Sequence, residues 1–296
     1  MDFGWATSWR TEVGSSFTWG DGVPMSGDPN ANAYIARHNV LSGMTMDAIQ
    51  QAAVQTFFTQ IKGAGTPNGS NLAPKLIDDL NSRLFLYCPV NDTTASFAAY
   101  ALSINLAEGT FVNMVSGDLS VNGVTGGAGK YLNFGNSPSS FSASNYALGL
   151  YMRNTAGASG QVPMGIIESG VTKAAFLNPR NASGNLASAM NQTGTDGTSN
   201  TNASGFYISS RTTNTEYMIF KNGSLFATKT HNTTTASSLN TYGHANNSNT
   251  GVTNEDSRQL CTLFHCLGLT ANEAEDLSFA INVFNTNCIT GGRNTY

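Results

Sequence analysis

The stretch from Thr215 to Thr230, TEYMIFKNGSLFATKT, constrains the fold of this chain more than any other. Two runs of aromatic, β-branched and apolar residues flank Asn222 and Gly223. Both residues of that pair tolerate the positive φ angles of a type I′ turn, so the turn fixes the register of a β-hairpin over Glu216–Thr230. The chain therefore contains an antiparallel sheet.

A helix closes this region. Thr270 and Glu273 have the spacing of a capping box, and Leu269 and Ala274 are placed as a hydrophobic staple. The apolar residues that follow fall on one helical stripe, so the helix is expected to lie as a lid on a sheet. That sheet is expected to include strands over Phe206–Ser210 and Gln259–Leu267.

The rest of the chain favours a sandwich preceded by helices. Apolar residues four apart predict a helix over Thr45–Lys62, and Pro74 suits the first turn of a short helix that ends at Leu80. Short apolar runs bounded by Gly, Asn and Ser then predict many strands, as in all-β sandwiches. Such strands are expected over Leu84–Val90, Phe97–Leu106 and Thr110–Val115, and the polar segment Asn191–Ser204 is expected to be an edge loop.

The first 43 residues form a separate unit in this interpretation. They hold all three tryptophans, Trp5, Trp9 and Trp19, in a Gly-rich stretch without a sustained helical or strand period. Aromatic side chains are enriched among interface anchors. The segment is predicted to be an arm that docks on another chain, and the alternative is that it packs on its own domain.

Two regions carry a resemblance to a known family. One is the order of strand, Lys-Asn-Gly hairpin, strand and Gly-Leu-Thr-x-x-Glu helix, and the other is GGAGKYLNFGNSPSSFSASNYALGLYMRN at Gly126–Asn154. Together they resemble the concanavalin A-like (laminin G-like) jelly-roll domains of bacteriophage virion proteins, over roughly Ile49–Thr286. The resemblance implies a mainly β, antiparallel sandwich, with an arm at 1–43, a helical lead-in at 44–83 and a lectin-like jelly roll at 84–296.

The same resemblance implies a role. A protein of this family would be a non-enzymatic tail-fibre, spike, baseplate or head-surface component that assembles in the host cytoplasm and remains on the virion. Other virion proteins would bind the arm, the chain would form a homo-oligomer, with a trimer favoured, and host-surface carbohydrate would be a ligand. The alternatives are a decoration protein without a ligand and a polysaccharide-degrading enzyme on the same sandwich.

Charge and hydropathy argue against two classes of partner. Charged residues make up 11% of the chain, against about 25% in ordinary soluble domains. The formal net charge is -4 without a basic cluster, and binding phosphates requires clustered Lys and Arg. No apolar stretch is long enough to span a membrane. Neither nucleic acid nor membrane is therefore expected as a partner.

No catalytic constellation is recognisable. Glucanases on this fold need two neighbouring carboxylates, yet Glu168, Asp196 and Glu216 are the only acids between Val121 and Asn254 and lie far apart in the sequence. None of the four histidines, His38, His231, His244 and His265, sits near a Gly-x-Ser-x-Gly nucleophile motif.

Metal ligands are sparse as well. Cys261 and Cys266 are five residues apart on one predicted strand, so they are expected on opposite faces and unable to form a disulfide. A zinc site from these two with His265 and Cys288 would match no standard spacing. Calcium binds oxygen ligands, which the turns at 91–92 and 254–256 offer, although the same residues are typical of turns. No cofactor is predicted, and calcium remains the one alternative.

Sugar binding uses aromatic rings that stack on pyranoses and amides that bond hydroxyls. Tyr207, Tyr217, Asn240 and Tyr242 have the right chemistry and are the candidate glycan-binding residues. The alternative for each tyrosine is a ring buried in the sandwich with its hydroxyl at the edge.

Overall fold

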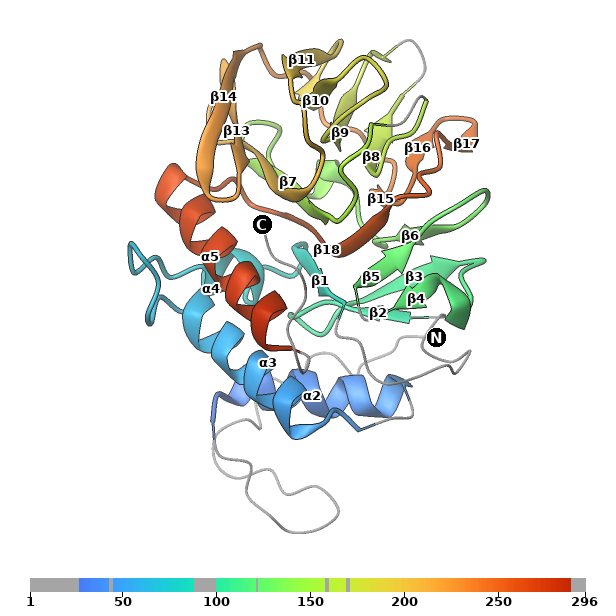
Figure 1. The fold of residues 1–296 in the computed structure, drawn as a ribbon. Helices are drawn as coiled ribbons and strands as arrows, with labels where there is room; N and C mark the ends of the chain where they lie inside the picture. The colour runs from blue at the N-terminus through green and yellow to red at the C-terminus, as the bar shows by residue number, and fades with distance from the viewer. Residues whose placement is uncertain are drawn as a thin grey trace, which may run out of the picture.

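The computed structural model describes residues 27–42, 45–87, 100–120, 122–157, 160–168 and 171–288. Two sheets pack face to face, and helices cover the outer side of one of them (Figure 1). In the described residues the first sheet (sheet A) has eight strands and the second (sheet B) has ten. All pairings are antiparallel except the short contact of β16 with β8. The predicted fold class, an antiparallel β-sandwich with helices before it and one after it, is confirmed.

Sheet A contains the C-terminal hairpin and the longest strands. Its order is β14-β13-β12-β7-β18-β5-β4, and β1 also pairs with β18. The bounds are β1 Arg83–Leu86, β4 Leu119–Ser120, β5 Gly123–Thr125, β7 Tyr146–Met152, β12 Gly205–Arg211, β13 Glu216–Lys221, β14 Ser224–Thr230 and β18 Gln259–Cys266.

Sheet B has the order β11-β10-β9-β8-β15-β6-β3-β2, with the hairpin β16–β17 attached to β8. The bounds are β2 Tyr100–Leu102, β3 Glu108–Val112, β6 Tyr131–Asn133, β8 Met164–Ile167, β9 Ala174–Asn178, β10 Asn185–Gln192, β11 Asp196–Ser199, β15 Tyr242–Gly243, β16 Asn246–Ser248 and β17 Gly251–Thr253. The helices are α2 Pro29–Ser42, α3 Ala48–Ile61, α4 Ala73–Leu76 and α5 Ala271–Asn287, and short 3-10 turns occupy Ser116–Asp118 and Pro138–Ser140.

Two hydrophobic clusters stabilise these layers. One fills the space between the sheets and includes Leu132, Leu150 and Leu263. The other lies between sheet A and the helices, where Phe57 of α3 meets Phe284 of α5 edge to face at 5.9 Å. The central strands β7 and β12 of sheet A are therefore buried on both faces, as strands between two layers must be.

The predicted hairpin and helix cap are confirmed. Asn222 has φ 54° and Gly223 has φ 84°, as the type I′ turn requires. The Thr270 hydroxyl accepts from the Glu273 backbone N–H while the Glu273 carboxylate accepts from the Thr270 N–H. The resulting helix covers sheet A, so the expectation of a lid is also confirmed.

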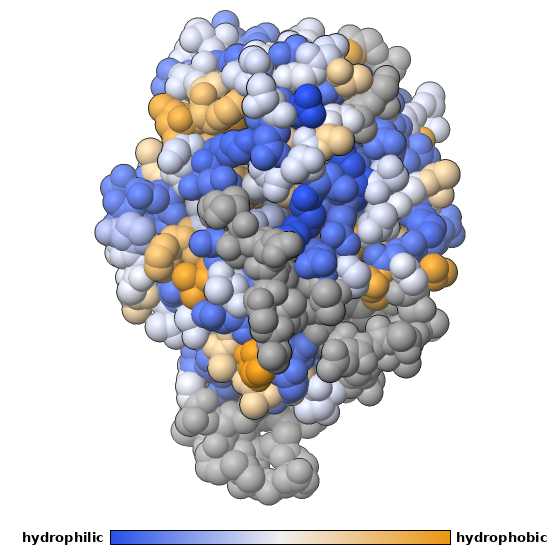
Figure 2. All heavy atoms as spheres, viewed as in Figure 1, coloured by the Kyte–Doolittle hydropathy of each residue, from blue (hydrophilic) through white to orange (hydrophobic). Residues whose placement is uncertain are grey.

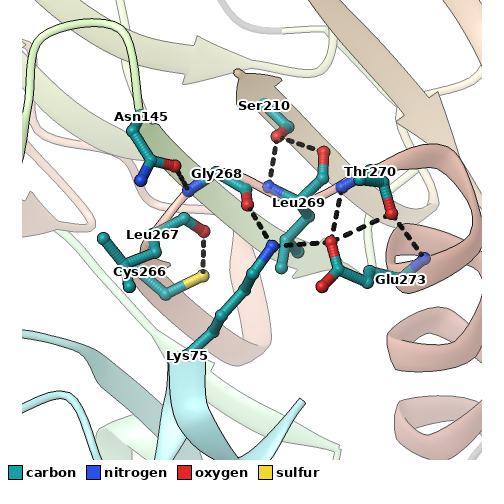
Figure 3. Close-up of polar contacts among 9 residues, drawn as sticks. All are labelled: Lys75, Asn145, Ser210, Cys266, Leu267, Gly268, Leu269, Thr270 and Glu273. Atoms are coloured by element: carbon teal, nitrogen blue, oxygen red, sulfur yellow. Dashed lines mark hydrogen bonds and ion pairs between the residues drawn. The ribbon is translucent and has the colours of Figure 1, made fainter. Parts of the chain in front are cut away.

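The joint between β18 and α5 is held by polar contacts from four elements (Figure 3). Lys75 Nζ donates to the Gly268 carbonyl and to Glu273 Oε2, both at 2.7 Å. The Ser210 hydroxyl accepts from the Leu269 N–H at 2.7 Å. A side chain at Gly268 would place its Cβ 2.2 Å from the Arg211 carbonyl oxygen, so only glycine fits this turn.

Part of the predicted arm belongs to the body of the protein. Residues 29–42 form α2, which the sequence interpretation did not expect. Asp28 Oδ1 accepts from the Asn30 N–H at 2.9 Å, and Gln55 Nε2 of α3 donates to Asn32 Oδ1 at 2.5 Å. The buried face, Ala31, Tyr34, Ile35 and His38, has helical spacing. Its histidine obscured the apolar stripe, whereas Asp28 and Pro29 are the N-terminal signal that was available.

Other boundaries also differ. The predicted edge loop Asn191–Ser204 contains strand β11, although it does lie at a sheet edge. The short helix ends at Leu76, and β2 is shorter than expected because Leu106 turns the chain with φ 67°. Residues 88–99 lie outside the described residues. Pairing with β10 makes β11 a strand, and polar composition alone does not reveal such pairing.

The surface agrees with the uncharged composition. The face shown in Figure 2 is mostly hydrophilic, and its apolar residues form small separate groups. No helix in the described part of the chain is long and apolar enough to cross a membrane.

Candidate functional site

The two sheets differ in what covers their outer faces. Helices α3 and α5 cover sheet A. On sheet B, the segment after β17 is fastened to the end of β9, because Arg258 Nη2 donates to Asn178 Oδ1 at 3.0 Å and Arg258 Nη1 donates to the Arg180 carbonyl at 2.9 Å. The part of sheet B formed by β3, β6 and β15 keeps partly exposed side chains. It is the candidate site.

A stacked pair of tyrosines marks this part of the sheet. The rings of Tyr131 on β6 and Tyr242 on β15 are 4.5 Å apart and inclined by 27°. Tyr131 and Asn133 point outward because Leu132 between them is buried in the core. The register pairs Tyr242 with Asn133, so the two tyrosines are diagonal neighbours across adjacent strands.

Amide side chains lie beside the rings. Asn240 Nδ2 donates to Asn133 Oδ1 at 3.2 Å, and Asn247 Nδ2 donates to the Asn240 carbonyl at 2.8 Å. Among the described residues, nothing bonds Asn133 Nδ2 or Asn240 Oδ1. Together with exposed Thr110, which lies opposite Asn133 on β3, they present neutral donors and acceptors.

A glycine lies next to Tyr242 on the β8 side. This residue is Gly165, where φ is 143° and an added Cβ would lie 2.3 Å from the Phe176 Cβ. Phe176 occupies the space over Gly165, so this position cannot carry a side chain of its own. Burial, followed by the neighbouring Tyr131 hydroxyl, raises the pKa of Tyr242 above its ordinary value. The phenol stays neutral at physiological pH.

Two of the four predicted glycan-binding residues are buried. Tyr207 is 0% exposed and Tyr217 is 1% exposed. The Tyr207 hydroxyl donates to the Asn202 carbonyl at 2.8 Å, and the Tyr217 hydroxyl donates to Asp196 Oδ2 at 2.8 Å. Burial raises the pKa of Tyr207 to about 12. Both rings fill the sandwich, so the prediction that they stack on a sugar is wrong.

The other two predicted residues, Asn240 and Tyr242, are brought together at the candidate site. The sequence interpretation missed Tyr131 and Asn133, although their alternation around Leu132 was a usable signal of an outward strand face. Trp5, Trp9 and Trp19 lie outside the described residues, so the docking prediction for the arm stays a prediction.

The cysteines differ from the expectation in their orientation. Cys261 and Cys266 are both buried between sheet A and the helices, because the register of β18 shifts between Leu260 and Thr262. That irregularity puts two residues an odd number apart on the same face. His265 faces the opposite core, where its ring meets Phe134 at 5.0 Å.

The structure separates the other candidate metal ligands too. Cys261, Cys266 and Cys288 are all buried, and burial raises the pKa of Cys266. Asp256, from the turn considered for calcium, is buried and paired with Arg258. In the described parts of the chain, no three His, Cys, Asp or Glu side chains are grouped so that they could hold a metal ion.

The acids considered for catalysis have separate positions. Glu168 pairs with Lys173 at 3.7 Å. Asp196 on β11 accepts from Tyr217 and from Gln192 Nε2 at 2.7 Å. Glu216 is exposed at the start of β13. Glu168 follows β8 whereas the other two lie on β11 and β13, and each of the first two acids is bound to a partner of its own.

Comparisons with known proteins give only distant matches. No protein-family model and no curated protein matches the chain. Among solved structures, it is similar to Trypanosoma rangeli sialidase in complex with the inhibitor DANA, at 13% identity and a TM-score of 0.49, covering 77% of this chain and 38% of that one. A mutant of that sialidase displaying trans-sialidase activity matches at 12% identity and a TM-score of 0.48, covering 79% of this chain and 39% of that one.

A further match is domain 4 of AbnA, a GH43 extracellular arabinanase from Geobacillus stearothermophilus, in complex with arabinotriose. It has 13% identity and a TM-score of 0.43, and covers 66% of this chain and 97% of that one. The chain thus spans less than two fifths of the sialidases. With such identities and TM-scores, the matches assign neither a family nor an activity, and the phage virion role stays a prediction.

Proposed function

We propose that this protein is a non-catalytic carbohydrate-binding protein whose site is the open part of sheet B around Tyr131 and Tyr242. The observation that carries the proposal is a half-buried tyrosine pair flanked by the amides of Asn133 and Asn240, on the part of a rigid sandwich that helices do not cover. Aromatic faces stack on sugar rings and amides bond hydroxyls, and few other ligands use both on a flat sheet.

Affinity electrophoresis in gels that contain a polysaccharide tests this. The wild-type protein should be retarded, and Tyr131→Ala and Tyr242→Ala should each lose retardation by about tenfold or more in apparent affinity. Phe279→Ala is the matched control, because Phe279 is a partly exposed aromatic residue on α5, away from sheet B. Equal retardation of all four proteins would contradict the proposal.

We further propose that the protein acts on a phage particle as an attachment component. The support is the sequence resemblance over Ile49–Thr286 and the tryptophan-rich segment before α2. Phage particles that assemble in the presence of a version of the protein without residues 1–26 should fail to incorporate it. Trp-to-Phe variants at positions 5, 9 and 19 then show which tryptophans are needed for incorporation. Normal incorporation of the truncated protein would refute the docking role of the segment.

A degrading enzyme on the same sandwich is the competing function. Incubation of the purified protein with the polysaccharide that retards it, followed by measurement of reducing ends, separates the two. A binding protein releases none above the buffer control. Sustained turnover would overturn the non-catalytic proposal.

A further inference from the structure

We infer that the open part of sheet B selects uncharged saccharides and rejects acidic ones. This inference rests on the proposed function and adds the chemical class of the ligand. It follows from the positions of the positive charges, because a carboxylate, sulfate or phosphate on a sugar must be compensated by a cation or by several N–H donors when it leaves water.

Two described cations on the strands of the tyrosine pair or beside them are paired with acids. Lys130 precedes Tyr131 in the chain, and its Nζ lies 2.6 Å from Asp118 Oδ1. On the β3 side, Arg37 of α2 pairs with Glu108. An acidic sugar would have to break one of these pairs and would then meet the released carboxylate.

Every Lys and Arg side chain in the described residues already contacts an acid or a neutral oxygen of the chain itself. Of the 14 Lys and Arg residues, Arg10 and Arg293 lie outside the described residues, which leaves 12. Six of these 12 pair with an acid, namely Arg37, Lys62, Lys75, Lys130, Lys173 and Arg258. The other six donate to carbonyl or amide oxygens of the chain, namely Arg83, Arg153, Arg180, Arg211, Lys221 and Lys229.

The groups that do face a ligand are neutral. Asn133 and Asn240 offer amide atoms, Thr110 offers a hydroxyl, and the two tyrosines offer ring faces and neutral phenols. The formal net charge of -4 adds a weak repulsion of anions. Hydroxyls of a neutral hexose or pentose can bond these groups without the desolvation of an unpaired charge.

The test compares neutral and acidic polysaccharides in the same electrophoresis. The neutral probes are dextran and galactomannan, and the acidic probes are polysialic acid and polygalacturonate. The wild-type protein should bind at least one neutral probe at least about tenfold more tightly than either acidic one. Raising the salt from about 50 to about 500 mM should leave that binding unchanged within about twofold, because no ion pair forms.

A gain-of-function variant makes the test sharper. Thr110→Lys adds an exposed cation opposite Asn133, on an outward position of β3 that tolerates polar residues. It should bind the acidic probes at least about tenfold more tightly than the wild-type protein does, and this new binding should fall with salt. Thr228→Lys, on the edge strand of sheet A, is the matched control. It should bind the acidic probes no more tightly than the wild-type protein does.

The outcomes separate this inference from the proposed function. Tyrosine-dependent binding of an acidic probe by the wild-type protein would overturn the neutral preference and leave carbohydrate binding intact. Binding of no probe, or binding that Tyr131→Ala and Tyr242→Ala do not weaken, would overturn both. Tyrosine-dependent binding of a neutral probe alone supports both.

Discussion

The two outer faces of the sandwich differ in chemistry and in what covers them. The outer face of sheet A presents Phe206, Ile208 and Phe264, and helices α3 and α5 bury it. The open part of sheet B presents Thr110, Tyr131 and Asn133, and no described helix packs over the tyrosine pair. An apolar sheet face must be removed from water. A face of amides and phenols can stay exposed, so it is where a ligand can bind.

The comparison implies that stability and binding can be separated by mutation. Substitutions under the helices should destabilise the fold without a specific effect on a ligand. Substitutions on the open part of sheet B should weaken ligand binding and leave the stability of the fold almost unchanged. The predictions below test this, from the largest expected change in the free energy of unfolding to the smallest.

Phe57→Ala should destabilise the protein most. Its ring is fully buried between α3, α5 and sheet A, and it packs edge to face on Phe284. Loss of a buried phenylalanine costs about 3 to 5 kcal/mol. Urea denaturation measures this, and Phe279→Ala on the exposed side of α5 should change stability by less than about 0.5 kcal/mol. Similar effects of both changes would contradict the placement of Phe57 in the buried layer between sheet A and the helices.

Acidification should lower the free energy of unfolding through the buried His244. Burial lowers the pKa of His244 to about 4, although Asp256 and Asp118 oppose the shift, from the ordinary 6.5. The unfolded chain therefore takes up a proton below pH 6.5 while the folded protein does not. The contribution of neutral His244 to the free energy of unfolding is fully present above pH 6.5. It decreases by roughly 1 kcal/mol per pH unit as the pH falls from 6.5 towards 4.

The measurement is the free energy of unfolding at pH 7 and at about pH 4.5. Asparagine suits the left-handed backbone of residue 244, where φ is 62°. His244→Asn should therefore fold and lose less stability between the two pH values than the wild-type protein. An unchanged loss would show that other groups carry the acid sensitivity.

Asp276→Asn should loosen the loop that leads into α4. The buried Asp276 carboxylate accepts from the Asn68 N–H at 2.9 Å and from the Ser70 N–H at 2.7 Å. Burial alone would raise the pKa of Asp276, but these hydrogen bonds outweigh it and hold the pKa below 3.8. Loss of the charge should cost about 1.5 kcal/mol.

Hydrogen exchange of the Asn68 and Ser70 amides reports this change directly. Both should exchange faster in Asp276→Asn, while amides of β6 and β15 keep their wild-type rates. Because the folded pKa is depressed, the stability that Asp276 adds is present at neutral pH and is lost as the pH falls below about 3.8. Acceleration across both sheets would mean that the loop is not an independent unit.

Tyr242→Ala should have the smallest effect on stability and the largest on binding. The ring is only half buried, and its described ring contact is Tyr131. A stacked pair on a surface contributes about 0.5 to 1 kcal/mol. Thermal unfolding and affinity electrophoresis on the same samples provide the test. A loss of stability near that of Phe57→Ala would show that the pair belongs to the core.

Some features of this protein were determined by local sequence alone. Asn222 and Gly223 set a turn, Thr270 and Glu273 set a cap, and the strands next to them followed, because hydrogen bonds and backbone angles within a few residues decide these structures. The antiparallel sandwich followed from repeated short apolar runs. The amide of Asn240 and the aromatic ring of Tyr242, which make them candidates for glycan binding, were also readable from residue type.

The tertiary structure decided which side chains are available. Tyr207 and Tyr242 are the same residue type and were equal candidates by chemistry, yet Tyr207 points into the sandwich and Tyr242 out of it. That orientation depends on the register of each strand with its neighbours, and a single shift, as in β18, reverses the faces. Tyr131 and Tyr242 are brought together by pairing across more than 100 residues. Long-range pairing of this kind leaves no mark in the local sequence.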